Sequence, residues 1–150
     1  MSMQILITGG AGFIGSHLTD RLVADGHQIT ILDNLATGRK ENLSAHLGGA
    51  NVTFIEGSIL DLPLLDSLIK ETEYVFHLAA AVGVFNIVNN PLASLLTNIR
   101  GTENILEAAH GTNTPVFLTS SSEVYGKNIS DSLKESDDRI LGSPVMLRWS

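Results

Sequence analysis

The sequence predicts an α/β domain built on a doubly wound, parallel β-sheet, and three observations carry this prediction. Short runs of β-branched and apolar residues alternate along the chain with amphipathic segments of helical spacing. Three glycines, each three residues after the last, separate the first apolar run from the first amphipathic segment. Glycine, proline or aspartate punctuates the later transitions. Strands that alternate with helices favour right-handed crossovers, and such crossovers produce a parallel sheet.

The first strand, turn and helix lie within residues 5–18, where the apolar run gives way to Gly9, Gly12 and Gly15. A residue without a Cβ can adopt positive φ and lets the backbone approach a phosphate group, and the third glycine lets helix and strand pack closely. The N–H groups and the positive dipole end of the new helix then face an anion. We therefore expect a dinucleotide to bind at this turn.

The next elements follow from apolar spacing and stop signals. A helix over residues 12–25 should pack on the first strand and end at Gly26. Residues 27–32 predict the second strand, and residues 52–56 predict the third. The connection between them, residues 34–50, is expected to be a loop with a short helix.

The second half continues the alternation. Asp61 is the expected N-cap of a helix with Pro63 in its first turn. Residues 74–78 and 115–119 predict the fourth and fifth strands, and the longest helix should run from Pro91 to about residue 110. Its apolar stripe is expected to face the core: Leu92, Leu95, Leu96, Ile99, Ile105, Leu106 and Ala109. The strand order 3-2-1-4-5 would place the ligand crevice over the first strand.

Asp33 lies at the end of the second strand, 18 residues after Gly15, where this fold places an acid that binds the adenosine ribose. The alternative is an acid that only caps a turn. A carboxylate that accepts a ribose hydroxyl contributes about 1.5–3 kcal/mol. A 2′-phosphate about 4 Å away would be repelled by about 4 kcal/mol at an effective dielectric near 20. An exposed ion pair between this phosphate and Arg39 or Lys40 would stabilise it by only about 0–1 kcal/mol. We therefore expect NAD rather than NADP.

Composition excludes several classes of partner. The chain has 150 residues, the length of one domain, and a net charge of −7 from 9 Lys and Arg against 16 Asp and Glu. Nucleic acid and anionic membranes both need a basic face. We expect no signal peptide, and no segment has the ~20 consecutive apolar residues of a transmembrane helix. We therefore expect no nucleic-acid or membrane partner, and a cytoplasmic location. Without cysteine, and with histidines that lack ligand spacing, no metal site is expected.

Small and hydroxyl residues follow the fourth and fifth strands. Ala79, Ala80 and Ala81 would let a flat cofactor lie on the backbone, although close packing alone could also account for them. The serines at 120–122 lie beside the expected crevice, but such clusters often satisfy their own backbone in a turn. No Gly-x-Ser-x-Gly elbow is present, which argues against a Ser-His-Asp hydrolase.

Five segments together resemble the extended short-chain dehydrogenase/reductase family, and within it the NAD-dependent nucleotide-sugar epimerases and dehydratases, UDP-glucose 4-epimerases among them. They are residues 8–15, 33–34, 77–80, 98–102 and 120–126. The resemblance implies a Rossmann-type fold and a tightly held NAD that is transiently reduced and returns its hydride to a keto-sugar. It implies cofactor contacts at Gly9, Gly12, Phe13, Ile14, Gly15, Asp33, Asn34, Ser58, Ile59, Leu78, Ala79, Ala80, Asn98 and Thr119.

The resemblance also assigns roles around the substrate. Ser121 would hydrogen-bond the reacting sugar hydroxyl, Glu123 would act in a decarboxylation, and Ser122 and Val82 would contact the nucleotide sugar. Two departures are visible: Ser58 stands where the family often has an adenine-binding aspartate, and Val82 stands where many galactose epimerases carry a lysine.

The family's catalytic Tyr-x-x-x-Lys is absent from the sequence. The expectation is therefore that residues 1–150 form an incomplete NAD-binding domain, truncated before the substrate domain, of an enzyme that pairs as a homodimer. The favoured activity is that of a UDP-sugar 4-epimerase. UDP-glucuronate decarboxylase or nucleotide-sugar dehydratase is the alternative, and a non-catalytic NAD-sensing module is the alternative of another class.

Overall fold

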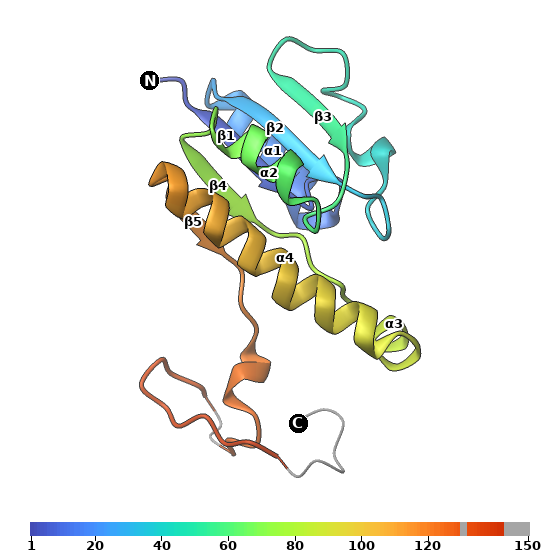
Figure 1. Ribbon diagram of the computed structural model, residues 1–150, viewed down its shortest axis with the longest axis vertical. Helices are drawn as coiled ribbons and strands as arrows, with labels where there is room; N and C mark the ends of the chain where they lie inside the picture. Colours follow the sequence, from blue (N-terminus) through green and yellow to red (C-terminus); the bar gives the residue numbers. More distant parts are fainter. Residues whose placement is uncertain (130–131, 143–150) are drawn as a thin grey trace. The chain divides into compact units, whose positions relative to one another are not determined.

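A computed structural model describes residues 1–129 and 132–142 and contains one five-stranded parallel sheet of order β3-β2-β1-β4-β5 (Figure 1). The strands are β1 (Gln4–Thr8), β2 (Gln28–Asp33), β3 (Val52–Glu56), β4 (Tyr74–His77) and β5 (Val116–Leu118). The predicted fold class and strand order are confirmed. The chain divides into two compact units, Met1–Leu118 and Thr119–Ser150.

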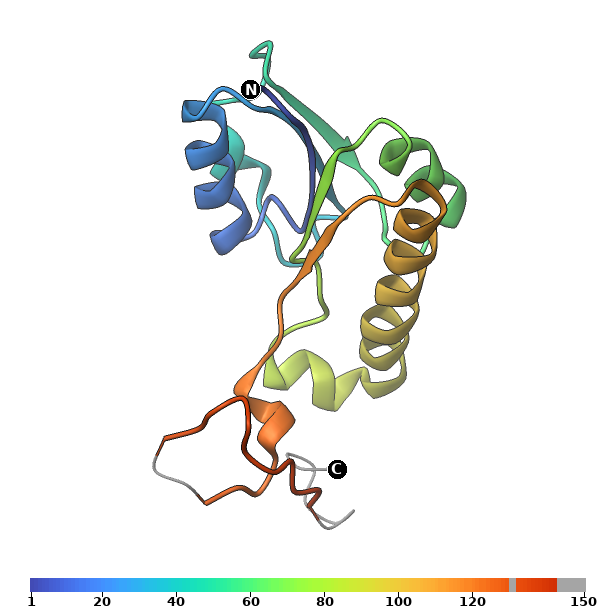
Figure 2. The same cartoon turned by 90° about the vertical axis from the view of Figure 1, so that its left-hand side faces the viewer.

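The sheet of the first unit is covered on both faces, α1 (Phe13–Ala24) lying on one and α2 (Leu62–Ile69) with α4 (Pro91–Thr112) on the other (Figure 2). The strands supply both cores because successive side chains point to opposite faces. Ile5 and Ile7 of β1 join the core under α1, whereas Leu6 joins the core under α2 and α4. Burial on both faces explains why β1 is apolar at consecutive positions.

The predicted helix ends are confirmed in detail. Gly26 follows α1 with φ of 88°, and its N–H donates to the carbonyl of Val23 at 3.0 Å. Glycine adopts this conformation without a steric penalty, so the helix ends there. At α2, the Asp61 carboxylate accepts from the N–H of Leu64 at 3.1 Å, as an N-cap residue does.

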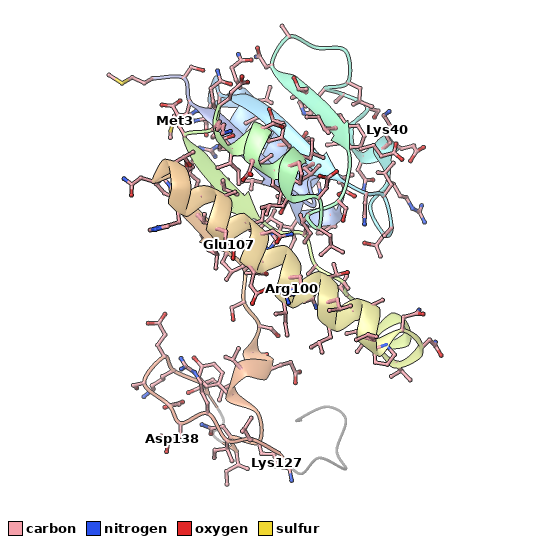
Figure 3. All side chains as sticks on the ribbon, in the orientation of Figure 1. Met3, Lys40, Arg100, Glu107, Lys127 and Asp138 are labelled. Carbon is pink, nitrogen blue, oxygen red and sulfur yellow. The ribbon has the colours of Figure 1, made fainter. Side chains whose placement is uncertain are left out.

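The expected loop of residues 34–50 contains one short 3-10 helix, η1 (Lys40–Leu43). Leu43 is fully buried and anchors the loop in the core under α1. Lys40, on the outer side of η1 in Figure 3, holds its ammonium 5.0 Å from the ring centroid of Phe54 in β3. One helix was not predicted from the sequence: α3 (Val84–Asn89) immediately precedes α4.

The prediction that the apolar stripe of α4 faces the core is wrong for most of its residues. Ile105 and Ala109 are buried, but five large residues are between 45% and 67% exposed: Leu92, Leu95, Leu96, Ile99 and Leu106. Apart from Ile105, the face that packs inward is made of small residues: Ser94, Gly101, Ala108 and Ala109. At Gly101 an added Cβ would clash with the side chain of Ile59, so the helix packs closely against Ile59 there.

The second unit carries little regular structure in its described residues. The 3-10 helix η2 (Ser122–Tyr125) is followed by an isolated bridge between Gly126 and Ile140. The Lys127 N–H donates to the Ile140 carbonyl at 2.9 Å, and the Ile140 N–H donates to the Tyr125 carbonyl at 3.2 Å. These bonds place Tyr125 and Lys127 beside Ile140.

Two alanine substitutions on α4 test the close packing at Gly101. Gly111 has open space around it, so Gly111→Ala should raise the free energy of unfolding by up to about 1 kcal/mol through helix propensity alone. Gly101→Ala makes the same gain but must displace Ile59, which costs about 1–3 kcal/mol. Urea unfolding should therefore find Gly101→Ala less stable than Gly111→Ala by that cost. Equal stability of the two variants would contradict the packing described here.

Candidate functional site

The turn between β1 and α1 is built from backbone that approaches other backbone. Gly9 has φ of 74°, and a Cβ on it would lie 2.8 Å from the nitrogen of Ala79, at the end of β4. A Cβ on Gly15 would meet the Gly9 carbonyl oxygen and lie 2.6 Å from the Cα of Gly10. Only glycine fits these two positions, because each contact is shorter than real Cβ contacts allow.

The N-terminus of α1 lies at this turn. Gly12 is the N-cap residue and supplies no side-chain cap. The N–H groups of Phe13, Ile14 and Gly15 belong to the first helical turn and have no acceptor within the helix. The side chains of Phe13 and Ile14 are 78% and 66% exposed. N–H groups and a positive dipole end at a turn without side chains fit a diphosphate.

Asp33 ends β2 beside the same turn, and only 8% of it is exposed. Its Oδ2 accepts the N–H of Ala11 at 3.0 Å, and its Oδ1 accepts the N–H of Leu35 at 2.8 Å. A Cβ on Gly38 would lie 3.0 Å from both oxygens. The carboxylate is therefore fixed in place, and each oxygen keeps a second lone pair for a ribose hydroxyl. The neighbouring Asn34 is exposed, and its side-chain oxygen accepts the N–H of Ala36.

The chain leaving β4 is held from two sides. The Leu78 N–H donates to the Thr8 carbonyl at 3.1 Å, and the Ala79 N–H donates to the Thr8 hydroxyl at 3.3 Å. From α4, the Asn98 side chain accepts the N–H of Ala81 at 2.7 Å and donates to its carbonyl at 3.3 Å. Asn98 thus acts on the backbone next to the expected cofactor contacts, and its own cofactor contact stays a prediction.

Ser58 and Ile59 follow β3. The Ser58 hydroxyl accepts the N–H of Leu60 at 3.1 Å, which closes a local turn. Ile59 is 6% exposed with its side chain against Gly101, and its carbonyl accepts the side-chain amide of Asn104 at 3.0 Å. A cofactor contact by Ile59 would therefore involve its backbone rather than its buried side chain.

A buried polar network under the site was missed by the sequence reasoning. His77 Nδ1 lies 2.7 Å from the Thr8 hydroxyl, and its Nε2 lies 3.2 Å from the Thr102 hydroxyl of α4. A neutral imidazole offers one donor and one acceptor to these two partners. Burial lowers the pKa of His77, because the charged form loses its hydration. Only the parallel register of β1 and β4, which pairs Thr8 with His77, could have revealed the contact.

The remaining predicted residues lie in other surroundings. Val82 is 55% exposed in the loop after β4, next to Gly83 with φ of 95°. Thr119, Ser121, Ser122 and Glu123 all belong to the second compact unit. There the Ser121 hydroxyl caps η2 by accepting the N–H of Glu123 at 3.3 Å. This is the turn that the sequence offered as the alternative interpretation of the serine cluster.

A family model described as the NAD dependent epimerase/dehydratase family matches residues 5–144. The chain belongs to this family. The first three predicted motifs lie at the carboxyl ends of neighbouring strands: the glycine turn after β1, the acid at the end of β2 and the small residues after β4.

Similar proteins include both decarboxylases and epimerases of this family. The UDP-N-acetyl-alpha-D-glucosaminuronate decarboxylase of Bacillus cytotoxicus is 44% identical over 150 residues, which is 100% of this chain and 46% of that protein. The UDP-N-acetylglucosamine 4-epimerase of Methanobrevibacter ruminantium, solved with UDP-N-acetylmuramic acid, gives a TM-score of 0.86 at 38% identity and covers 98% of this chain and 47% of that one.

A third similar protein was solved with the family's cofactor. The UDP-glucose 4-epimerase of Brucella ovis in complex with NAD gives a TM-score of 0.81 at 31% identity, over 93% of this chain and 42% of that one. The chain therefore spans less than half the length of each of these relatives. Within the part of the chain that the structure describes, no helix combines the length and apolar character that a membrane crossing requires.

The buried network predicts a pH dependence of stability. In the unfolded chain the imidazole of His77 takes up a proton below about pH 6.5. In the folded chain it does so only at a lower pH, because burial lowers its pKa. The free energy of unfolding should therefore fall as pH drops below about 6.5, by at most about 1.4 kcal/mol per pH unit from this residue. Urea unfolding of His77→Gln between pH 7.5 and 5 should give a shallower slope than wild type, at lower overall stability. Parallel curves for the two proteins would contradict the assignment.

Proposed function

We propose that this chain binds NAD and forms the cofactor-binding part of a nucleotide-sugar epimerase that acts on a UDP-sugar. The observation that carries the proposal is the glycine turn with a fixed carboxylate beside it, in a chain of the NAD dependent epimerase/dehydratase family. NAD, when bound, would supply reversible hydride transfer with a carbon of the sugar.

The residues of this chain would bind and orient that cofactor. The N–H groups that open α1, from Phe13 to Gly15, would donate to the diphosphate. Asp33 would accept a hydroxyl of the adenosine ribose, and its negative charge would disfavour a 2′-phosphate there. Ala79 and Ala80, which follow β4, would let the cofactor lie against backbone. Cofactor contacts are also proposed for Asn34, Ser58, Ile59, Leu78, Asn98 and Thr119.

Ser121 would hydrogen-bond the reacting hydroxyl, since a serine hydroxyl can donate one bond while it accepts the N–H of Glu123. Ser122 and Val82 are proposed substrate contacts. An enzyme of this kind would be cytoplasmic and would work as a homodimer, and the exposed apolar residues of α4 support such pairing.

A decarboxylase is the second candidate activity. The decarboxylase of Bacillus cytotoxicus, 44% identical to this chain, supports it, and Glu123 is the residue that would act in that reaction. Both activities would begin with the same oxidation of a UDP-sugar by NAD. They differ in whether a carboxyl group leaves the keto-sugar before the hydride returns.

Substrate turnover distinguishes the activities. The full-length protein, incubated with UDP-glucose and separately with UDP-glucuronate, is expected to interconvert the first with its C4 epimer and to release no carbon dioxide from the second. Nuclear magnetic resonance of the sugar products would follow both reactions. Carbon dioxide release from UDP-glucuronate would overturn the epimerase proposal and identify the protein as a decarboxylase. Binding of NAD without turnover of any UDP-sugar would favour the NAD-sensing module.

A charge-neutral variant tests the ribose contact. Asp33→Asn keeps the volume of the side chain but loses its charge, so NAD should bind about tenfold to a hundredfold more weakly in a calorimetric titration. Asp25→Asn, at the exposed C-terminal end of α1, removes the same charge and should leave NAD affinity unchanged. Thermal unfolding of both variants would separate a loss of affinity from a loss of fold. Unchanged affinity in a folded Asp33→Asn protein would overturn the ribose assignment.

A further inference from the structure

Ala11 is a fully buried residue in the middle of the glycine turn, and both of its backbone polar groups have partners from the end of β2 or from the chain that follows it. Its N–H donates to Asp33 at 3.0 Å. Its carbonyl accepts the N–H of Arg39 at 3.0 Å and the side-chain amide of Asn42 at 2.8 Å. The Asn42 bond joins two segments 31 residues apart, and it is made by a side chain outside the β1–α1 motif.

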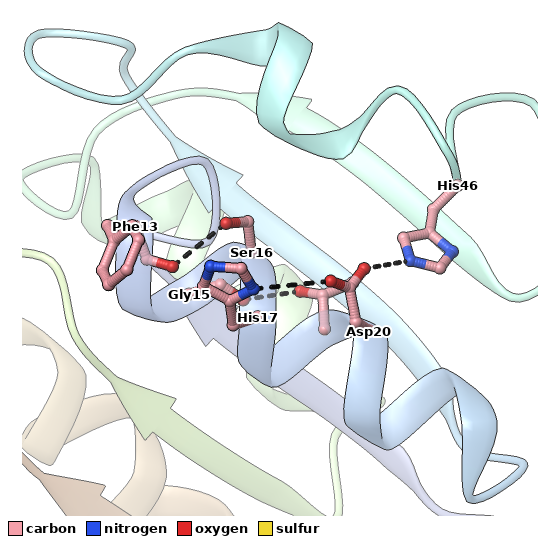
Figure 4. Close-up of polar contacts among 7 residues, drawn as sticks. Phe13, Gly15, Ser16, His17, Asp20 and His46 are labelled. Carbon is pink, nitrogen blue, oxygen red and sulfur yellow. Dashed lines mark hydrogen bonds and ion pairs between the residues drawn. The ribbon is translucent and has the colours of Figure 1, made fainter.

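Asn42 belongs to a segment that is attached to the turn and to α1 at several other points. We call residues 38–46 the clasp. At one end, a Cβ on Gly38 would lie 3.0 Å from the Cβ of Ala11. Leu43 is fully buried in the core, and Nε2 of His46 lies 2.6 Å from Oδ1 of Asp20 on α1 (Figure 4). The clasp is therefore held in position independently of any one of these contacts.

The carbonyl that Asn42 binds shares a planar peptide unit with the N–H of Gly12. That N–H donates to the Gly9 carbonyl at 3.1 Å, so the peptide is held at both ends. Gly12 is also the N-cap of α1, and its carbonyl accepts the N–H of Ser16 at 3.0 Å. The orientation of this peptide therefore determines where the first helical turn begins and where its free N–H groups point.

We propose that Asn42 is a positioning residue for the diphosphate of the cofactor, an inference that rests on the proposed NAD binding. It acts through the Ala11 carbonyl rather than by touching the ligand. A turn already held in its binding conformation loses less freedom when a ligand binds. Without the Asn42 amide, the Ala11–Gly12 peptide keeps the Arg39 N–H but samples more orientations, and the α1 N–H groups meet the diphosphate less well.

The experiment compares three ligands against matched variants. Asn42→Ala should raise the Kd of NAD and of ADP by the same factor, about threefold to tenfold, because both carry the diphosphate. The Kd of adenosine, measured by competition with NAD, should not change. Asn42→Gln keeps an amide donor and should recover part of the loss. Ser44→Ala, an exposed neutral position in the clasp, should bind all three ligands as the wild type does.

A ligand-free measurement checks the physical step. Amide hydrogen exchange at Ala11 and Gly12 should be about threefold to tenfold faster in Asn42→Ala than in wild type and unchanged in Ser44→Ala. If Asn42 only stabilised the fold, Asn42→Ala would lower the unfolding temperature without changing the Kd of ADP and the Kd of adenosine by different factors. Wild-type affinity for NAD in Asn42→Ala, or equal losses for all three ligands, would overturn this inference alone. A wild-type protein that binds no NAD would overturn the proposed function.

Discussion

The close approach of Gly9 to the backbone of Ala79 is the contact on which the candidate site depends. β1 and β4 are neighbours in the sheet, and the chains leaving them can meet only because Gly9 carries no Cβ. Gly15 extends the constraint by bringing α1 down onto the Gly9 carbonyl. No side chain can enter between these backbones. The result is a helix N-terminus whose N–H groups are available to a ligand, at the carboxyl end of the central strand β1.

The strand order converts this local turn into a site. β1 lies between β2 and β4, so the residues that end both neighbours are brought to the turn from opposite sides. Asp33 arrives from β2 and binds the Ala11 N–H, while Ala79 arrives from β4 and binds the Thr8 hydroxyl. His77 connects the same hydroxyl to α4. Asp33 and Ala79 are thus each held by a hydrogen bond to another element, which limits their motion before any ligand binds.

Much of this arrangement could be predicted because it depends on short-range chemistry. The three glycines at their spacing indicated the turn, Asp61 and Pro63 indicated the start of α2, and Gly26 indicated the end of α1, since each choice is made by the local backbone. The alternation of strands and helices indicated the parallel sheet, and the strand order came from the dinucleotide-binding fold that the glycine turn indicated. Among the α-helices of the described residues, the sequence missed α3, which has six residues and is too short for a helical period to show.

The sequence by itself determined the elements, their order and the identity of the turn. Tertiary structure decided which face of α4 is buried, because the helix rotates to place Gly101 against Ile59 and leaves its leucines outside. It also decided the polar partners, since the bonds from Asn98 to Ala81, Asn42 to Ala11 and Thr8 to His77 join residues 17, 31 and 69 positions apart. The sequence shows that one face of a helix is apolar, or that a side chain can donate a hydrogen bond. Which neighbour it meets depends on how separate elements pack together.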